Sequence, residues 1–191
     1  MNFGALPSSG GALPALAATG MQGGVKMIGG WVFALTFLAA LGSGLMAGLF
    51  FVFSAFMMTA LARLPAGQGM AAMQSINVAI LNPAFGAAFF GTAILSAVLV
   101  VVAAFRWSDA GMAWLLAGGL LYLVGIIAVT MVFNVPLNDA LAAAGADTPE
   151  GAALWTRYVA EWTAWNHLRT VSGLAALACF IMALAAGRAA G

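Results

Sequence analysis

The run PAFGAAFFGTAILSAVLVVVAAF, residues 83–105, contains no charged side chain. As a helix it is long enough to cross a hydrocarbon core about 30 Å thick, which needs roughly 20 residues. Three further apolar runs have similar length, at about residues 31–59, 112–133 and 170–187. A segment in lipid must satisfy its own backbone hydrogen bonds, and the alternating pattern of barrel strands is missing. The sequence therefore predicts an all-α fold, a four-helix transmembrane bundle.

The composition supports the same class. Of the 191 residues, 64% are hydrophobic and 6% are charged, which leaves too little polar surface for a soluble domain of this size. The formal net charge of +1 gives no electrostatic footprint for nucleic acid, so no nucleic-acid partner is expected. The expected partners are the lipid bilayer and a lipophilic small molecule, and the sequence leaves homo-oligomerisation open.

Residues 1–26 differ from the rest of the chain. They are rich in Gly, Pro, Ser and Ala, and they lack the basic start and apolar core of a secretory signal. We expect a mobile N-terminal tail at 1–26 and a single four-span membrane domain at 27–191. The capping signature Thr148-Pro149-Glu150 predicts that a helical extension begins there, well before the fourth span.

The few charged residues predict the orientation. The side that carries both termini has three basic residues and one acidic residue: Lys26, Arg106, Arg188 and Asp109. The other side has more acidic than basic residues: Arg63, Arg157, Asp139, Asp147, Glu150 and Glu161. By the positive-inside rule, both termini are expected in the cytoplasm, with the protein in the inner or plasma membrane.

Polar side chains gather at the end of the predicted bundle away from the termini. The stretch WTAWNHLRT, residues 162–170, begins the fourth span and holds the only His of the chain. On a helix, Asn166 and Arg169 share one side with two tryptophans, while His167 lies about 100° further round. The residues predicted to form a site at this end are Ser54, Asn77, Asn82, Asn134, Asn138, Trp162, Trp165, Asn166, His167 and Arg169.

Some of these residues also have a purely structural interpretation. Asn82 before Pro83 suits a helix N-cap. Asn134 or Asn138 can be a turn residue beside Pro136, where the third helix is expected to end. Asn77 can face water on an interfacial helix. An aromatic and basic belt at the membrane interface is expected for three neighbouring residues, Trp155, Arg157 and Tyr158.

The chain offers few ligands for a metal or an organic cofactor. It has one His and one Cys, which lies far from the His, and few acidic residues. It has neither a second His for haem nor a Gly-rich dinucleotide motif. We therefore expect no bound metal and no cofactor.

Four motifs together resemble the anthrone oxygenase-like family of small membrane proteins. They are SGLMAGLFFVFSAFMMTAL at 43–61, MQSINVAILNPAF at 73–85, FNVPLNDAL at 133–141 and W-x-x-WNHLRT at 162–170. The Asn-x-Pro-x-Asn and Trp-Asn-x-x-Arg elements are the specific parts of a resemblance that covers about residues 31–187. The resemblance implies a four-helix membrane fold. For the fungal members it implies oxidation of an anthrone to an anthraquinone by dioxygen, the co-substrate.

Such an oxidation can proceed without a cofactor, because an anthrone that loses a proton becomes a delocalised carbanion able to reduce dioxygen. His167 is the predicted base, since imidazole ordinarily titrates near neutral pH. Asn166 and Arg169 are the predicted donors to the phenolate or peroxide, and Trp162 and Trp165 the aromatic slot. The sequence thus predicts an oxygenase-like membrane oxidoreductase acting on a lipophilic phenolic or anthrone-like substrate.

A second hypothesis comes from another class of function. The chain can be a non-catalytic membrane protein that binds a small ligand or a partner helix, with the Asn and Arg side chains in a structural network. Buried Asn and Arg in lipid need partners whether or not they take part in chemistry. The size of the pocket discriminates between the two, because a network filled by side chains leaves no room for a tricyclic substrate.

Overall fold

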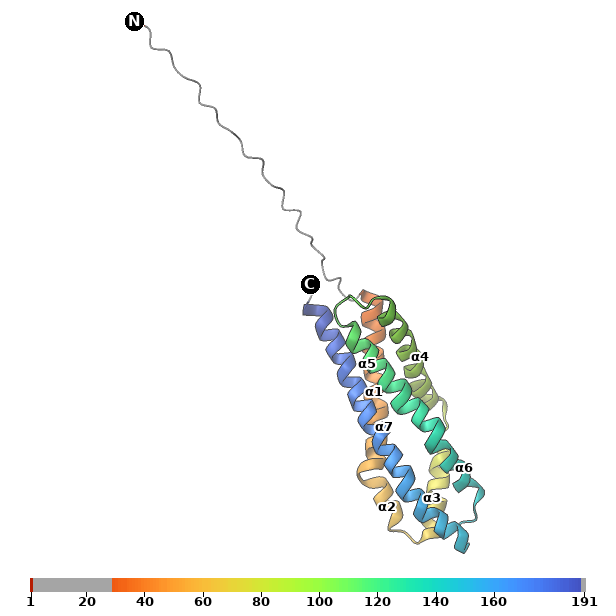
Figure 1. The fold of residues 1–191 in the computed structure, drawn as a ribbon. Helices are drawn as coiled ribbons and strands as arrows, with labels where there is room; N and C mark the ends of the chain where they lie inside the picture. Colours follow the sequence, from red (N-terminus) through yellow and green to blue (C-terminus); the bar gives the residue numbers. More distant parts are fainter. Residues whose placement is uncertain (2–28, 190–191) are drawn as a thin grey trace.

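The computed structural model describes Met1 and residues 29–189, and every regular element within 29–189 is a helix. Four long helices run along the same axis (Figure 1). All four are long and apolar enough to cross a membrane: Gly30–Ala62, Pro83–Phe105, Met112–Ala143 and Pro149–Gly187. The predicted all-α four-helix bundle is confirmed, and the chain is an integral membrane protein. The predicted tail, apart from Met1, lies outside the described residues.

Short π-helical segments interrupt two of the long helices. The first consists of α1 (Gly30–Val52), η1 (Phe53–Met57) and α2 (Met58–Ala62). The third consists of α5 (Met112–Tyr122), η2 (Leu123–Ala128), η3 (Thr130–Asn134) and α6 (Val135–Ala143). The second and fourth are single α-helices, α4 (Pro83–Phe105) and α7 (Pro149–Ala189). A shorter helix, α3 (Ala66–Ala79), connects the first to the second.

Local capping explains where two of these helices begin. The Asn82 side-chain oxygen accepts a hydrogen bond from the Phe85 N–H at 3.0 Å, just before Pro83 opens α4. Thr148 Oγ1 accepts from the Gly151 N–H at 3.0 Å, which caps the start of α7. The N-cap interpretation of Asn82 and the helical extension before the fourth span are both confirmed.

The third helix does not end at Pro136, and that prediction was wrong. Val135 begins α6, which continues to Ala143 with Pro136 in its first turn. A proline in a helix lacks the N–H of one backbone bond, and its ring presses on the preceding turn. Here the preceding turn is the π-helix η3, which ends at Asn134 and is wider than an α-helical turn. The helix axis therefore carries on past the proline.

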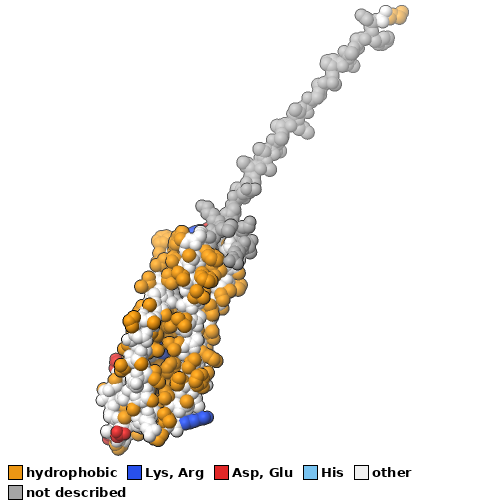
Figure 2. Space-filling view, turned by 180° about the vertical axis from the view of Figure 1, so that it is seen from behind, with side chains coloured by type: hydrophobic (Ala, Val, Ile, Leu, Met, Phe, Trp, Pro, Cys, Tyr) orange, Lys and Arg blue, Asp and Glu red, His pale blue; other side chains and the backbone are white. Residues whose placement is uncertain are grey.

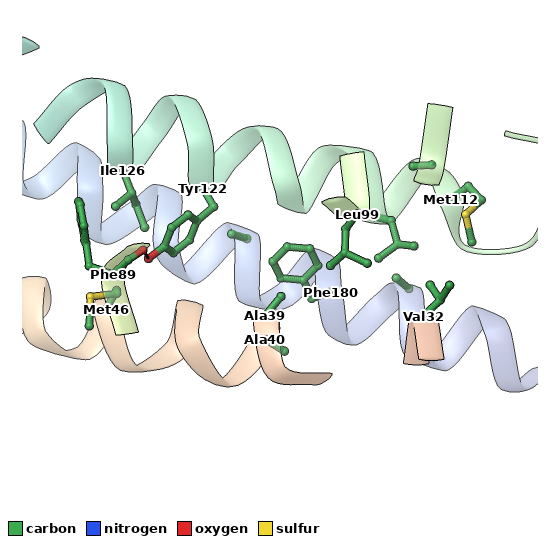
Figure 3. Close-up of a cluster of buried hydrophobic side chains, with 14 of the residues drawn as sticks. Val32, Ala39, Ala40, Met46, Phe89, Leu99, Met112, Tyr122, Ile126 and Phe180 are labelled. Atoms are coloured by element: carbon green, nitrogen blue, oxygen red, sulfur yellow. Dashed lines mark hydrogen bonds between the residues drawn. The ribbon is translucent and has the colours of Figure 1, made fainter. Parts of the chain in front are cut away.

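The main hydrophobic core fills the half of the bundle where α1 begins and α7 ends (Figure 1). Figure 3 shows many of its side chains. Tyr122 is fully buried there and donates a hydrogen bond to the Phe89 carbonyl at 3.0 Å. Two glycines bring backbones close together in this half. A Cβ on Gly42 would clash with Thr92 of α4, and one on Gly119 of α5 with Val100. Close backbone contact through small residues is typical of helix packing in membranes.

A second core cluster lies at the other end, where α3 packs against α7. Trp155 and Tyr158 are buried in it and stack with ring centroids 5.7 Å apart. Their predicted place in an interfacial belt was wrong, because α3 covers this face of α7. Arg157 is exposed and pairs with Glu161 at 2.8 Å. Figure 2 shows hydrophobic side chains over much of the body, with the larger charged patches toward this end.

Candidate functional site

Arg169 lies buried near the middle of α7, with 5% of its surface exposed. One terminal nitrogen, Nη2, donates to Asn166 Oδ1 at 2.8 Å, and the other, Nη1, donates to Thr130 Oγ1 at 3.3 Å. The guanidinium carbon lies 4.4 Å from the centre of the Phe50 ring and 5.0 Å from that of Trp162. In the part of the chain that the structure describes, the Arg169 Nε–H has no hydrogen-bond partner. Neutral dipoles and two aromatic faces therefore hold the positive charge.

No carboxylate balances this charge within the part of the chain that the structure describes. The two ion pairs formed there are Arg106–Asp109 and Arg157–Glu161, and neither involves Arg169. A charge removed from water without an opposite charge costs stability. Ionisable groups buried in a membrane protein at such a cost mark functional sites. Arg169 is therefore the centre of the candidate site.

Asn166 is fully buried and holds Arg169 in place. Its Nδ2 donates to the Phe50 carbonyl at 2.7 Å and to Ser54 Oγ at 2.8 Å, which leaves Oδ1 free for the guanidinium. Thr170 Oγ1 lies 3.1 Å from Ser54 Oγ and completes the link between α7 and the first helix. Ser54 belongs to the π-helix η1 and Thr130 to η3. Both irregular turns thus supply groups to the site, as π-helical turns often do.

A pocket of about 110 Å³ lies beside Arg169. Residues from all four long helices and from α3 line it: Leu49, Phe50, Phe53, Met73, Ile76, Asn77, Ile80, Leu81, Phe85, Thr130, Val135, Asn138, Trp162 and Arg169. The pocket has room for several water molecules. It is smaller than the roughly 300–1,000 Å³ typical of small-molecule sites. A tricyclic ligand fits only if side chains such as Met73 and Leu81 move aside.

A second set of polar groups lies on the α3 side of this pocket. Tyr158 of α7 is fully buried, and its hydroxyl donates to Asn138 Oδ1 at 2.8 Å. The Tyr158 hydroxyl oxygen accepts a hydrogen bond from Asn77 Nδ2 at 3.4 Å. Asn77 and Asn138 both line the pocket. The site therefore has a cationic end at Arg169 and a neutral polar end at these two amides, with mostly apolar walls between them.

The structure brings together many of the residues predicted from the sequence, either on the pocket wall or directly behind it. Trp162, Arg169, Asn77 and Asn138 line the pocket. Behind the wall, Ser54 and Asn166 form the hydrogen bonds described above, and buried Asn134 donates to the Trp162 carbonyl at 3.2 Å. Asn134 Oδ1 and Trp162 Nε1 are buried and have no hydrogen-bond partner among the described residues.

Three predicted residues lie elsewhere. His167 is exposed and does not line the pocket, because the next position on a helix is turned by about 100° from Asn166. Trp165 faces a separate groove and stacks on Phe133, with ring centroids 3.6 Å apart. Asn82 is exposed as the cap of α4. The geometry gives these three side chains no contact with a ligand beside Arg169.

Reasoning from the sequence missed Thr130, Tyr158 and Phe50. A signal for Tyr158 was available, since it precedes Trp162 and Asn166 at successive intervals of four residues, which places all three on one side of a helix. Thr130 likewise precedes Asn134 by four residues. Phe50 contributes a ring and a backbone carbonyl, and no sequence pattern distinguishes it from the other apolar residues around it.

Residues 82–179, just over half of the chain, match a family model described as anthrone oxygenase. The chain belongs to the anthrone oxygenase family. The region matched to the anthrone oxygenase model begins at the cap of α4 and includes Thr130, Asn138, Tyr158 and Arg169, but neither α1 nor α3. No curated protein and no solved structure matches the chain.

Potential metal ligands are sparse around the site. Within residues 29–189, no group of three or more His, Cys, Asp or Glu side chains lies close enough together to hold a metal ion. Asn, Thr, Trp and Arg side chains supply the polar lining instead. These groups can donate hydrogen bonds to an oxygen atom and stabilise negative charge on it.

Proposed function

We propose that this protein is a membrane oxygenase that oxidises a lipophilic phenolic or anthrone-like substrate with dioxygen in the pocket beside Arg169. One observation carries the proposal. Within the described residues, a buried guanidinium without a carboxylate partner faces a pocket with aromatic and apolar walls. A ligand that carries or develops a negative oxygen supplies the missing opposite charge, and membership of the anthrone oxygenase family points to such a ligand.

The chemistry assigned to Arg169 is stabilisation of the substrate anion. When an anthrone loses a proton from its methylene carbon, the negative charge spreads onto the former carbonyl oxygen. Asn166 and Thr130 already hold the guanidinium in place, so it does not have to reorganise to bind that oxygen. The attraction between the two charges is also stronger in a site that excludes water than in water itself. The carbanion then reduces dioxygen. Overall, one anthrone and one dioxygen give one anthraquinone and one water.

The pocket itself supplies no obvious base. Its described lining residues include no Asp, Glu or His. We therefore propose that a base in solution removes the substrate proton. Arg169 makes this step easier because it stabilises the anion that forms. His167, the base predicted from the sequence, has no part in this proposal because its side chain is exposed outside the pocket.

Dioxygen consumption tests the proposal directly. Purified protein with 1,8-dihydroxyanthrone is expected to consume dioxygen faster than the spontaneous autoxidation measured without protein. One anthraquinone should form per dioxygen consumed, as followed by its visible absorption. Mass spectrometry of small molecules retained by the purified protein should identify a phenolic aromatic compound.

A second candidate function is favoured by the small size of the pocket. At about 110 Å³ it suits a non-catalytic protein that binds a smaller ligand, with Arg169 and the amides as a binding network. Under this alternative, the dioxygen experiment gives no rate above autoxidation, and the retained molecule is smaller than a tricycle. The two candidates therefore predict opposite results in the same preparation.

We further propose that both termini are cytoplasmic and that the pocket lies toward the opposite side of the inner or plasma membrane. Asp147 lies just before α7 and Ser108 lies between α4 and α5, and both residues are exposed. Figure 1 shows these two connections at opposite ends of the bundle. In a Cys179→Ser background, Asp147→Cys should react with a membrane-impermeant thiol reagent in intact cells, whereas Ser108→Cys should react only after lysis. The reverse labelling pattern would place the pocket on the cytoplasmic side.

A further inference from the structure

At the neutral end of the pocket, the Tyr158 hydroxyl bonds one group of each of two asparagine amides, and the other group of each amide stays free within the described residues. The hydroxyl donates to Asn138 Oδ1 and accepts from Asn77 Nδ2. Neither Asn77 Oδ1 nor Asn138 Nδ2 has a partner within the described part of the chain, and both residues line the pocket. One amide acceptor and one amide donor are thus available to a ligand.

This result does not depend on which way each amide is oriented. A tyrosine hydroxyl has one proton, so it donates to one of the two amides and accepts from the other. If both amides were turned round, Asn138 would offer its oxygen and Asn77 its nitrogen. In either arrangement, one acceptor and one donor remain free. Tyr158 therefore determines the hydrogen-bonding character of this end of the pocket.

The two polar ends are separated by a stretch of mostly apolar wall. Thr130, which is bonded to Arg169, and Asn138, which is bonded to Tyr158, lie eight positions apart in the third helix. That spacing corresponds to roughly 12 Å along the axis. The Trp162 ring lies near both ends, with its centre 5.0 Å from the Arg169 guanidinium carbon and 6.0 Å from the centre of the Tyr158 ring. A ligand that reaches both ends must be elongated and apolar in the middle.

We propose that Asn77 and Asn138 form a second ligand subsite that binds a neutral hydroxyl group on the end of the substrate remote from Arg169. A hydroxyl fits both free groups at once, because it donates to one amide oxygen and accepts from the other amide nitrogen. A carbonyl or ether oxygen can only accept. The subsite deepens the proposed function and rests on it: the substrate class becomes an elongated aromatic with an ionisable oxygen at one end and a hydroxyl at the other.

Two anthraquinones that do not react with dioxygen provide the test, 1-hydroxyanthraquinone and 1-hydroxy-6-(hydroxymethyl)anthraquinone, whose second hydroxyl is an alcohol that stays neutral. Their binding to purified protein can be followed by quenching of tryptophan fluorescence, to which Trp162 contributes from the pocket wall. Wild-type protein is expected to bind the compound with two hydroxyls about tenfold more tightly, as two modest net hydrogen bonds allow. Asn77→Leu should lower the ratio of the two dissociation constants to about threefold, because the hydroxyl loses one of its two partners while the Tyr158–Asn138 bond stays.

Two further variants serve as a second test and as a control. Asn138→Ala removes the other half of the subsite and should lower the ratio as well, which protects the test if Asn77→Leu folds poorly. Asn82→Ser changes an exposed amide outside the pocket, keeps a capping oxygen for α4, and should leave the ratio unchanged.

The possible outcomes separate the subsite from the proposed function. If the wild-type ratio is near one, or if Asn77→Leu and Asn138→Ala leave it unchanged, the subsite is wrong. The proposed function survives that result when Arg169→Gln weakens the binding of both quinones. If wild-type protein shows no saturable binding of either compound, the pocket beside Arg169 is not a site for this class of ligand, and both proposals fail.

Discussion

Arg169→Gln should lower the turnover of 1,8-dihydroxyanthrone by about 10²- to 10³-fold, the usual cost of removing a preorganised group that stabilises a developing oxyanion. Glutamine keeps an amide donor for Asn166 but lacks the positive charge. The fold should survive, because the substitution removes a buried charge that has no opposite charge beside it. The measurement is dioxygen consumption corrected for autoxidation, together with thermal unfolding of the same preparation.

Two other variants test whether the shape of the guanidinium matters and whether His167 takes part. Arg169→Lys keeps the charge but loses the planar fork that reaches Asn166 and Thr130 together, so we expect it to lose turnover as well. His167→Gln changes an exposed side chain two positions earlier on the same helix and should keep wild-type turnover. A large loss in His167→Gln with full activity in Arg169→Gln would contradict the proposed role of the guanidinium and restore His167 as the candidate base.

A carboxylate introduced beside Arg169 should sharply lower the turnover without unfolding the protein. Thr130 accepts a hydrogen bond from Arg169 Nη1 at 3.3 Å and lines the pocket, so Thr130→Asp places a negative charge against the guanidinium. The substrate oxyanion must then compete with a fixed counterion. We expect turnover to fall by about 10²-fold, comparable to the loss of an oxyanion-stabilising group.

Thr130→Asn is the matched control for this substitution, since asparagine has nearly the same shape as aspartate and no charge. It should keep most of the turnover, and the aspartate variant should melt at an equal or higher temperature because the buried charge gains a partner. Equal turnover in the two variants would show that the charge of Arg169 is not used by the substrate. The proposed role of Arg169 in the reaction would then be wrong.

Much of the fold could be predicted because its causes are local. The run from Pro83 to Phe105 is a helix with the predicted bounds, since a backbone in lipid has to bond within its own segment. The caps at Asn82 and Thr148 depend on side chains within three residues of the backbone groups they satisfy. The rule that a proline ends a helix failed at Pro136, because the wider π-helical turn before it accommodates the proline ring.

The candidate site was predictable in location but not in detail. The four polar helix ends were predicted to meet, and Arg169, Asn166, Trp162 and Ser54 lie close together. The roles within the cluster could not be assigned, because polar residues occur on several sides of α7 around the site, so its periodicity does not identify the face that packs inward.

The sequence by itself determined the membrane class, the four helices, the caps and the end of the bundle where polar groups collect, since composition and neighbouring residues are sufficient causes for each. Only the tertiary structure decided that Arg169 is buried without a carboxylate partner from residues 29–189, while His167 is exposed. It also decided that α3 buries Tyr158 beside Asn77 and Asn138. The physical reason is that burial and pairing depend on helices distant in sequence, whose packing faces no local pattern specifies.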